Sequence, residues 1–342
     1  MQREEALKVQ IATRSDPGGE RAENNDCLAS LSTRHGDLLV VADGVGLTKA
    51  AGKGSRLVVE AVVDFYRRWD GLQPRQMLVD AIGQANLAVR EAVADNPDLE
   101  GMGATVAVLH HQKGAIRFAH VGNNRVYRQR GNVIDQMTND HTEAQRLADA
   151  GKIPQEAVRN HPKESILYRA VGSEAVLEVD LSDAHYVQAG ETYLLCTDGL
   201  YTMMDDADLG RAARNMEPDQ AAQALIHLAN ERGAADNLSV AIIKFSQPPR
   251  EAKAFTDGVA GPPTIQRATT SRTLPGLRWE TLTAWWKVRL IALGLLLLWF
   301  LLLLLGWWLK SPTEAVQAAL WLPPAGAVIW DGKRPRPRRR KR

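Results

Sequence analysis

The sequence predicts an α+β fold in which sheets and helices form separate layers, and three observations favour it. Short apolar runs rich in Val, Ile and Leu are typical of buried strands. Between them lie segments whose apolar residues recur three and four positions apart, as in amphipathic helices. Two of these helical segments follow one another directly, and several strands are joined by short turn-rich segments. This favours antiparallel pairing over a doubly wound sheet.

The individual elements follow from these patterns in chain order. Strands are predicted at residues 38–42, 104–109, 115–121, 193–196 and 239–245. Helices are predicted at residues 54–69, 74–94 and 217–232. The turn-rich segments 110–114 and 130–132 are expected to link neighbouring antiparallel strands.

Composition excludes several classes of protein. The 342 residues are 45% hydrophobic and 24% charged, which is typical of a folded globular chain. Two cysteines, Cys27 and Cys196, are too few for a disulfide scaffold or a cysteine-rich zinc module. Residues 1–250 hold 27 Lys and Arg against 35 Asp and Glu, whereas residues 251–342 hold 15 against 5. Nucleic acid is therefore not expected as a partner, because a binding domain would itself be basic.

The C-terminal part of the sequence has the features of a membrane anchor. Residues 247–288, rich in Pro, Gly, Thr and Arg, are interpreted as a linker and juxtamembrane segment. Residues 290–309 carry no charge, span about 30 Å as a helix and have Trp near both ends, which predicts a transmembrane helix at 289–310. The segment 311–342 ends in KRPRPRRRKR, which is either a solvated tail or a site for anionic membrane lipids.

The orientation of this predicted span follows from the flanking charges. The N-terminal sequence MQREEALKVQ has no apolar stretch of the kind that a signal peptide needs. Basic residues precede the span at positions 267, 272, 278, 287 and 289, against only Lys310 close behind it. The positive-inside rule then places the N-terminal domain in the cytoplasm, with a single pass through the membrane.

Five short segments contain Asp or Asn beside Gly or another Asn, and four of them lie within two residues of a predicted strand. They are Arg21-x-x-Asn24-x-Asp26, Asp43-Gly44, Gly122-Asn123-Asn124-Arg125, Asp198-Gly199 and Ala235-Asp236-Asn237. Each Asp-Gly taken alone is typical of a turn. Carboxylates at several strand ends can also converge into an oxygen-rich cluster, which suits hard divalent cations such as Mg²⁺ and Mn²⁺.

In this order the motifs resemble a known family. RAENND, VADGVG, GMGAT, AHVGNNRVYR, TNDHT, LLCTDGL and ADNLSV are similar to the bacterial branch of the metal-dependent protein serine/threonine phosphatases, the protein phosphatase 2C-like family. The resemblance covers about residues 8–246 and identifies 1–246 as the catalytic domain. It implies an α-β-β-α sandwich of two antiparallel sheets with metals in a cleft at one end. It also implies phosphorylated proteins as substrates, an opposing serine/threonine kinase, and a bacterial inner-membrane location for the anchored chain.

The resemblance also implies roles for individual residues. Asp43 corresponds to the aspartate that bridges two Mn²⁺ or Mg²⁺ ions, and the carbonyl of Gly44 to a ligand of the second ion. Asp198 and Asp236 correspond to ligands of the first ion. Asp26 corresponds to the carboxylate that holds metal-bound waters. Two metals that share a hydroxide can aim it at phosphorus, so no covalent phosphoenzyme is needed.

Arg21 corresponds to the guanidinium that binds the phosphate, and its planar fork suits two phosphate oxygens. The cysteines at 27 and 196 are interpreted as small packing residues beside the ligands. His141 in the TNDHT motif is interpreted as structural, and His110-His111 as a strand end. The segment 144–172 is expected to form a flap beside the cleft, either as a substrate selector or as a plain surface loop.

The sequence departs from the family pattern at four positions. Asn123 replaces an aspartate that contributes to a third, weaker metal site, which puts a third ion in doubt. Asn25 replaces a usual glutamate, and Lys53 stands where glutamate is common. Val45 stands where animal members have a histidine. The losses at Asn25 and Asn123 favour an alternative function, a catalytically weak phosphoprotein-binding or scaffolding module at the membrane. A phosphatase for small phosphate esters is a third hypothesis.

Overall fold

The computed structural model describes residues 8–46, 49–246 and 265–269. In these ranges no helix has both the length and the apolar character to cross a membrane. The predicted transmembrane helix at 289–310 and the basic tail lie outside the described residues, as does most of the predicted linker 247–288. The fold is therefore that of the predicted catalytic domain with one further strand.

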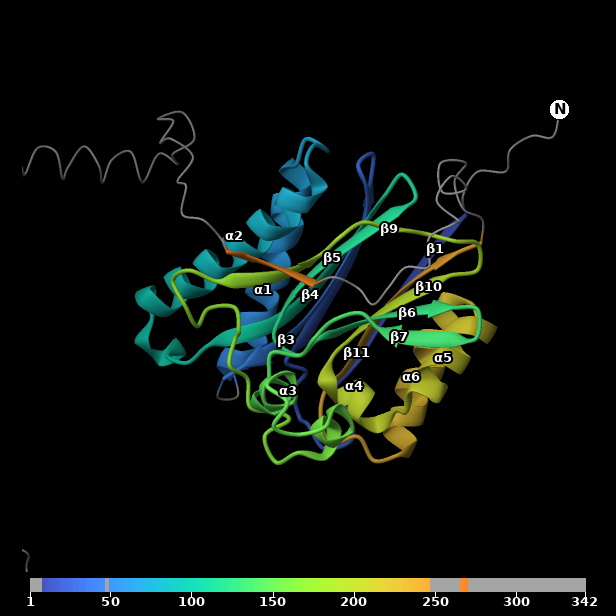
Figure 1. Cartoon of the computed structure of the whole chain (residues 1–342). Helices are drawn as coiled ribbons and strands as arrows, with labels where there is room; N and C mark the ends of the chain where they lie inside the picture. Colours follow the sequence, from blue (N-terminus) through green and yellow to red (C-terminus); the bar gives the residue numbers. More distant parts are fainter. Residues whose placement is uncertain (1–7, 47–48, 247–264, 270–342) are drawn as a thin grey trace, which may run out of the picture. The chain divides into compact units, whose positions relative to one another are not determined.

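Two antiparallel sheets lie face to face (Figure 1). One sheet contains, in spatial order, β12 (Ile265–Thr269), β8 (Glu178–Ser182), β5 (Ala115–Val121), β4 (Gly103–Gln112), β3 (Gly36–Val45) and β2 (Asp26–Thr33), and the short β9 (His185–Tyr186) pairs with β5. The other contains β1 (Val9–Asp16), β11 (Leu238–Phe245), β10 (Thr192–Cys196), β6 (Arg125–Arg130) and β7 (Val133–Gln136). The expected antiparallel pairing is confirmed.

Helices cover the outer face of each sheet (Figure 1). The first sheet packs against α1 (Lys49–Arg68) and α2 (Pro74–Asp95). The second packs against α4 (Asp198–Met203), α5 (Asp206–Asn215) and α6 (Pro218–Glu231). The short α3 (Glu143–Asp149) and the 3₁₀ turns Pro97–Leu99 and Gln155–Asn160 lie in the connections. The layers form the α-β-β-α sandwich that the resemblance implies.

Strand β3 explains why the central strands read as continuous apolar runs. Successive side chains of a strand point to opposite faces of the sheet. Leu38 and Val40 accordingly belong to the core between the sheet and the helices α1 and α2. Leu39 and Val41 belong to the core between the two sheets. Because both faces are buried, no polar alternation is present in this strand.

The hairpin that joins β4 and β5 confirms the turn predicted at 110–114, in a shorter form. Its two central residues, Lys113 and Gly114, both have positive φ angles, 50° and 73°. This is the combination that two-residue hairpin turns require to match the twist of their strands. His110 and His111 lie within β4 instead of in the turn.

All eight predicted elements are present, and their ends differ from the predicted ones by five residues or fewer. The patterns missed β1 and β2, which are only partly buried and contain polar residues, and the helices α3, α4 and α5, which are too short for clear periodicity. They also missed β6 to β9 and, outside the predicted catalytic domain, the strand β12. This strand lies in the predicted linker 247–288 and pairs with β8, with Arg267 opposite Asp180, so part of the linker extends the first sheet.

Candidate active site

Two of the predicted site aspartates come from neighbouring strands of the first sheet. Asp26 is the first residue of β2 and lies directly opposite Asp43 of β3 in the antiparallel register. Directly opposed side chains point to the same face, so both carboxyl groups lie at one end of this sheet. Gly44 is required beside them, because a Cβ there would lie 2.1 Å from the carbonyl oxygen of Ala51.

The other two aspartates come from the second sheet. Asp198 follows β10 as the first residue of α4, and Asp236 lies two residues before the neighbouring strand β11. A Cβ at Gly199 would lie 2.1 Å from the carbonyl oxygen of Asn237, so a glycine is needed for these two segments to touch. The structure therefore brings all four predicted aspartates together, and the charges of the other three all act on Asp43.

A hydrogen bond that the sequence analysis missed joins the two halves of this cluster. The Thr197 hydroxyl donates to Asp26 Oδ2 at 2.9 Å and accepts from the amide of Ser239 at 3.1 Å. Thr197 follows β10 in the second sheet, whereas Asp26 begins β2 in the first. The hydroxyl therefore bridges the two sheets at the site. Its position directly before Asp198 in LLCTDGL was the signal that could have found it.

The electrostatics of the cluster favour a bound cation. Burial, and then the charges of Asp198, Asp26 and Asp236, raise the pKa of Asp43 well above its usual range. Burial also raises the pKa of Asp26 to about 7, and burial followed by the charge of Asp236 raises the pKa of Asp198. In the described part of the chain, Asp26 Oδ1 and Asn123 Oδ1 are buried without a hydrogen-bond partner. A set of crowded oxygen donors with little countercharge fits Mn²⁺ or Mg²⁺.

We expect the affinity of this site for Mn²⁺ to rise with pH. The pKa of Asp26 is raised to about 7 and that of Asp43 is raised as well, so in the metal-free protein these carboxyl groups keep their protons to a higher pH than free aspartates do. Metal binding must displace those protons, so the dissociation constant should fall by about tenfold per pH unit for each proton released, between about pH 6 and 8. Calorimetry in two buffers of different ionisation enthalpy measures the release. A dissociation constant that does not change with pH would contradict this.

Arg21 lies at the rim of the cluster and pairs with one of the predicted ligands. Its Nη2 donates to Asp236 Oδ2 at 3.0 Å, and its Nε donates to the carbonyl of Ala235 at 3.2 Å. About half of each side chain is exposed to solvent, 50% for Arg21 and 49% for Asp236. The guanidinium can therefore be reached by a phosphate from outside, and a cation at Asp236 competes with this ion pair.

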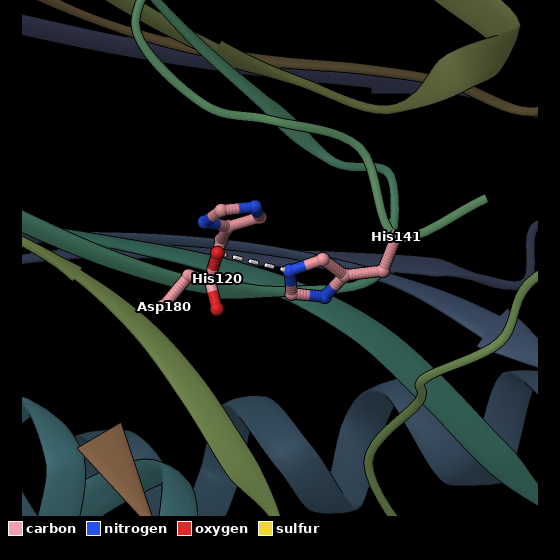
Figure 2. Close-up of side chains that lie close together, drawn as sticks. All are labelled: His120, His141 and Asp180. Carbon is pink, nitrogen blue, oxygen red and sulfur yellow. Dashed lines mark ion pairs between the residues drawn. The ribbon is translucent and has the colours of Figure 1, made fainter. Parts of the chain in front are cut away.

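A second group of potential ligands lies apart from the four aspartates. His120, His141 and Asp180 are buried, and one ligand atom of each lies within 4.8 Å of the others (Figure 2). Arg169 Nη1 lies 2.8 Å from Asp180 Oδ1 and 3.1 Å from His141 Nε2. This guanidinium already supplies the positive charge that a metal ion would bring. We therefore do not assign the group as a metal centre.

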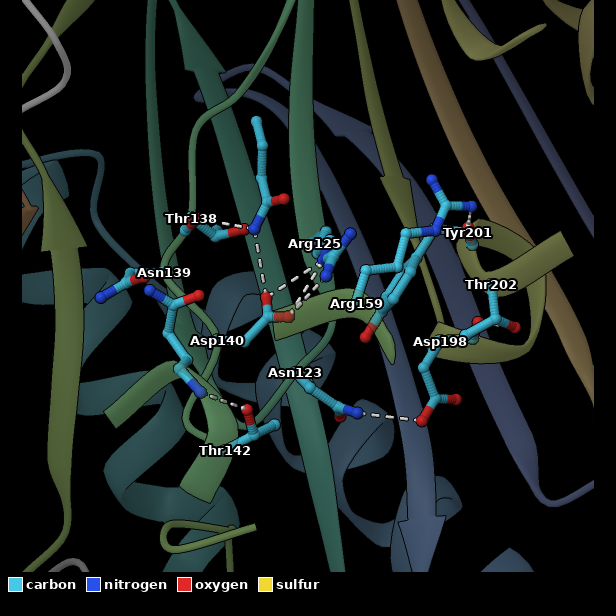
Figure 3. Close-up of polar contacts among 12 residues, drawn as sticks. Asn123, Arg125, Thr138, Asn139, Asp140, Thr142, Arg159, Asp198, Tyr201 and Thr202 are labelled. Atoms are coloured by element: carbon cyan, nitrogen blue, oxygen red, sulfur yellow. Dashed lines mark hydrogen bonds and ion pairs between the residues drawn. The ribbon is translucent and has the colours of Figure 1, made fainter. Parts of the chain in front are cut away.

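The loop Gly122–Arg125 connects the first sheet to the second beside Asp198. Asn123 Nδ2 donates to Asp198 Oδ2 at 2.9 Å, and Arg125 makes three hydrogen bonds of 2.8 to 3.1 Å with Asp140 (Figure 3). The guanidinium carbon of Arg125 lies 3.6 Å from the centre of the Tyr201 ring. The position where the family pattern has an aspartate is thus held by an amide that touches a predicted metal ligand.

The segment 144–172 lies beside the site, as predicted for a flap. Arg159 Nη2 donates to the carbonyl of Tyr201 at 3.1 Å and also to the carbonyl of Met204, at the C-terminal end of α4. Together with Asp198, this segment lines a small cleft, whose residues are Asn123, Arg125, Asp140, Val158, Arg159, Glu164, Ser165, Asp198, Tyr201 and Thr202. Arg159 was missed because its partners are backbone carbonyls about forty residues away, which leave no local pattern.

The two cysteines do not have the character of nucleophiles. Cys196 is buried in β10, and burial raises the pKa of its thiol to about 12. Burial also raises the pKa of Cys27. A reactive cysteine needs a depressed pKa, so the interpretation of both as packing residues agrees with their surroundings.

We expect Asn123→Asp to make stability more dependent on metal. The change removes the hydrogen bond to Asp198 and places a fifth carboxylate beside it. The free energy of unfolding of the metal-free protein should therefore fall by about 1–3 kcal/mol, which lowers its melting temperature by several degrees. Mn²⁺ should then raise the melting temperature of the variant by more than that of the parent. The variant should also need less metal for activity or have a higher turnover. Thermal melts and activity titrations with Mn²⁺ test this, with the exposed turn residue Asn132, changed to Asp, as control. Indistinguishable curves would mean that Asn123 only caps a turn.

The fold and the site together define a two-sheet sandwich with an acidic metal-binding centre of the protein phosphatase type. Residues 19–240 match the family model described as Protein phosphatase 2C. The chain belongs to the protein phosphatase 2C family.

Its relatives are bacterial serine/threonine phosphatases. PstP of Mycobacterium tuberculosis H37Rv is 33% identical over 237 residues, which are 69% of this chain and 45% of that protein. The serine/threonine phosphatase stp of Listeria innocua is 29% identical, over 68% of this chain and 94% of that protein. The chain thus spans less than half the length of its mycobacterial relatives.

Solved structures give the same result. The catalytic domain of PstP in complex with two manganese ions is 32% identical, with a TM-score of 0.63 over 71% of this chain and all of that one. The serine/threonine phosphatase of S. agalactiae is 29% identical, with a TM-score of 0.65 over 69% of this chain and 99% of that one.

Proposed function

We propose that this chain is a metal-dependent phosphatase that hydrolyses phosphoserine and phosphothreonine in proteins. The observation that carries the proposal is the convergence of Asp26, Asp43, Asp198 and Asp236 at one point between the two sheets, with Arg21 at its rim. Membership of the family and the manganese-bound relative support it.

In this proposal the residues divide the work between holding metal and orienting the reactants. Asp43, Asp198 and Asp236 would hold two Mn²⁺ or Mg²⁺ ions, with the Gly44 carbonyl as a further ligand. Such ions supply positive charge for phosphate oxygens and lower the pKa of water. Asp26 is fixed through Oδ2, and its Oδ1, which is buried without a hydrogen-bond partner, would accept a proton from a water.

Arg21 would bind the phosphate through its guanidinium, which can donate two parallel hydrogen bonds to phosphate oxygens. It contacts Asp236 with Nη2 and the Ala235 carbonyl with Nε, so phosphate binding would exchange at least one of these contacts. The cleft beside Asp198, lined in part by residues of the 144–172 segment, would contact the peptide around the phosphorylated residue.

The test is phosphate release by the full-length chain from a phosphothreonine peptide, with Mn²⁺ or with EDTA. Metal-dependent release from the peptide, faster than from p-nitrophenyl phosphate, supports the proposal. Release from the small ester alone would indicate a small-molecule phosphatase. Tight peptide binding without release would indicate the scaffolding alternative, which the amides at Asn25 and Asn123 favour.

We propose further that the chain is anchored in the bacterial inner membrane by the single predicted helix 289–310, with the catalytic domain in the cytoplasm and a serine/threonine kinase pathway as its context. The uncharged run of residues and the preceding basic residues support this. The basic tail would bind anionic lipids on whichever side it lies. Cysteines introduced at Asp64 and near Arg342 can be tested with a membrane-impermeant thiol reagent in intact cells. Labelling of the cysteine at position 64 would contradict the orientation.

A further inference from the structure

The loop Gly122–Arg125 has a special place in the fold because it crosses from one sheet to the other. It leaves β5 in the first sheet and enters β6 in the second. Its two central residues reach both halves of the acidic cluster. Asn123 donates to Asp198, and Asn124 donates to the carbonyl of Val41, two residues before Asp43 in β3, at 3.2 Å. The position of this loop therefore bears on the spacing of the predicted metal ligands.

Two consecutive residues of another segment, Asp140 and His141, hold the two ends of the loop. Asp140 is buried and accepts three hydrogen bonds from Arg125. His141 Nδ1 accepts a hydrogen bond from the amide of Gly122 at 3.0 Å, and the His141 amide donates to the Gly122 carbonyl, also at 3.0 Å. Both ends of a four-residue loop are thus fixed by neighbouring positions in the TNDHT motif.

The ring of His141 is itself held in one orientation and one tautomer. The amide of Gly122 can only donate, so Nδ1 carries the lone pair and the proton of the neutral ring lies on Nε2. The 3.1 Å contact of Arg169 Nη1 with Nε2 is then not a hydrogen bond, because both atoms carry hydrogen. Nε2 faces Asp180 Oδ2 at 3.3 Å (Figure 2). Asp180 is in turn paired with Arg169. The ring of His120 stacks on it, with centroids 4.7 Å apart. Buried partners on every side leave the ring no alternative orientation.

The loop is also packed closely against strand β4. Gly122 has a φ angle of 98°, and a Cβ at this position would lie 2.3 Å from Thr105 Cγ2. Thr105 lies in β4 directly opposite Asp43. The loop is therefore packed between the strand that flanks one metal ligand and the imidazole of His141.

We propose that Asp140 and His141 are positioning residues that fix the loop Gly122–Arg125 and thereby hold Asn123 against Asp198 in the geometry that metal binding requires. The inference rests on the proposed metal-dependent function, but it concerns metal affinity and can be tested without turnover. A displaced loop must be reordered before the ligands can close on a cation, and that cost is subtracted from the binding free energy.

Two substitutions of His141 separate positioning from packing. In His141→Asn the side-chain oxygen takes the place of Nδ1 and can still accept from Gly122. In His141→Gln the amide nitrogen takes the place of Nε2 and can still donate to Asp180, but the acceptor for Gly122 is lost. Both variants lose the ring and its stacking on His120. A purely structural role predicts similar effects of the two substitutions.

The measurement is the dissociation constant for Mn²⁺ by calorimetry on the full-length chain in detergent, with the metal-free melting temperature. We expect His141→Asn to bind Mn²⁺ within about threefold of the parent and His141→Gln to bind about tenfold more weakly. His110→Gln is the control, because His110 is also a buried histidine but lies five residues along β4 from Thr105, about 17 Å away. It should lower the melting temperature and leave the Mn²⁺ constant unchanged.

Equal Mn²⁺ constants for the two His141 variants, whether weakened or not, would overturn the proposal. So would Zn²⁺ binding that is lost in His120→Asn, because the histidine group would then be a metal site. If His141→Gln does not fold, ¹⁵N spectra of the parent decide: a proton on Nδ1 of His141 overturns the proposal, and one on Nε2 supports it. A parent that binds Mn²⁺ but releases no phosphate refutes the proposed function and leaves this test intact.

Discussion

Asp43→Asn is expected to remove most of the activity while the protein stays folded. Asp43 lies at the centre of the acidic cluster, where the charges of Asp26, Asp198 and Asp236 all act on it. An amide has no charge to offset the dehydration of Mn²⁺, so kcat/KM on a phosphothreonine peptide should fall by at least about 100-fold at saturating Mn²⁺. Calorimetry should show a matching loss of Mn²⁺ binding.

The same variant should be at least as stable as the parent without metal. The pKa of the Asp43 carboxyl group is higher in the folded than in the unfolded state, so the folded protein binds this proton more tightly. The free energy of unfolding therefore falls as the pH rises past the pKa of the unfolded state. At pH 7 an amide removes that cost, and the metal-free melting temperature should stay equal or rise. Asp64→Asn, at an exposed carboxylate in α1, should change neither activity nor melting temperature. Parent-like turnover in Asp43→Asn would refute the metal-dependent mechanism.

Arg125→Met is expected to cause the largest loss of stability, about 3–5 kcal/mol. The substitution removes three hydrogen bonds to Asp140, which is only 3% exposed, and leaves that buried carboxylate with the Gln136 amide but without a positive charge beside it. It also removes the contact between the guanidinium and the Tyr201 ring. Urea unfolding of the metal-free protein, followed by circular dichroism, measures the change.

Two further variants test the cause of that loss. Arg125→Met combined with Asp140→Leu should recover part of the stability, because the unpaired buried charge is gone. Arg14→Met breaks an ion pair with Asp219 in which both side chains are about half exposed or more, and it should cost less than about 1 kcal/mol. A loss in Arg125→Met no larger than in Arg14→Met would show that burial of the pair adds nothing.

The sequence was most informative where a local pattern carried the signal. Strand β3 is buried on both faces and stood out as an apolar run, and the motifs around Asp43 and Asp198 lie where strands end. Asp43, Asp198 and Asp236 lie within three residues of predicted strands, whereas Asp26 was identified through the resemblance of RAENND to the family. Strand β2 could not, because its residues are only partly buried and half of them are polar, so its position depends on pairing with β3.

Contacts between distant segments left no such signal. Thr197 and Asp26 are 171 positions apart, and Arg159 binds carbonyls of α4 more than forty positions away. Only the folded chain brings these partners together. Strand β12 was missed for a related reason, since residues 265–269 lie in a Pro-, Gly- and Thr-rich stretch and become a strand by pairing with the edge strand β8.

The division of the aspartates between two sheets has a mechanical consequence. Asp26 and Asp43 belong to one sheet, Asp198 and Asp236 precede or follow strands of the other, and the Thr197 hydroxyl ties the two halves together at the site. A cation held by both pairs would crosslink the two sheets, which are otherwise joined at the site by hydrogen bonds such as that from Thr197 to Asp26. At a metal concentration 100 times the dissociation constant, the bound cation adds about 2.7 kcal/mol to the free energy needed to separate the two sheets. Force applied across the two sheets in a single-molecule pulling experiment should therefore meet more resistance in the loaded protein than in the metal-free one.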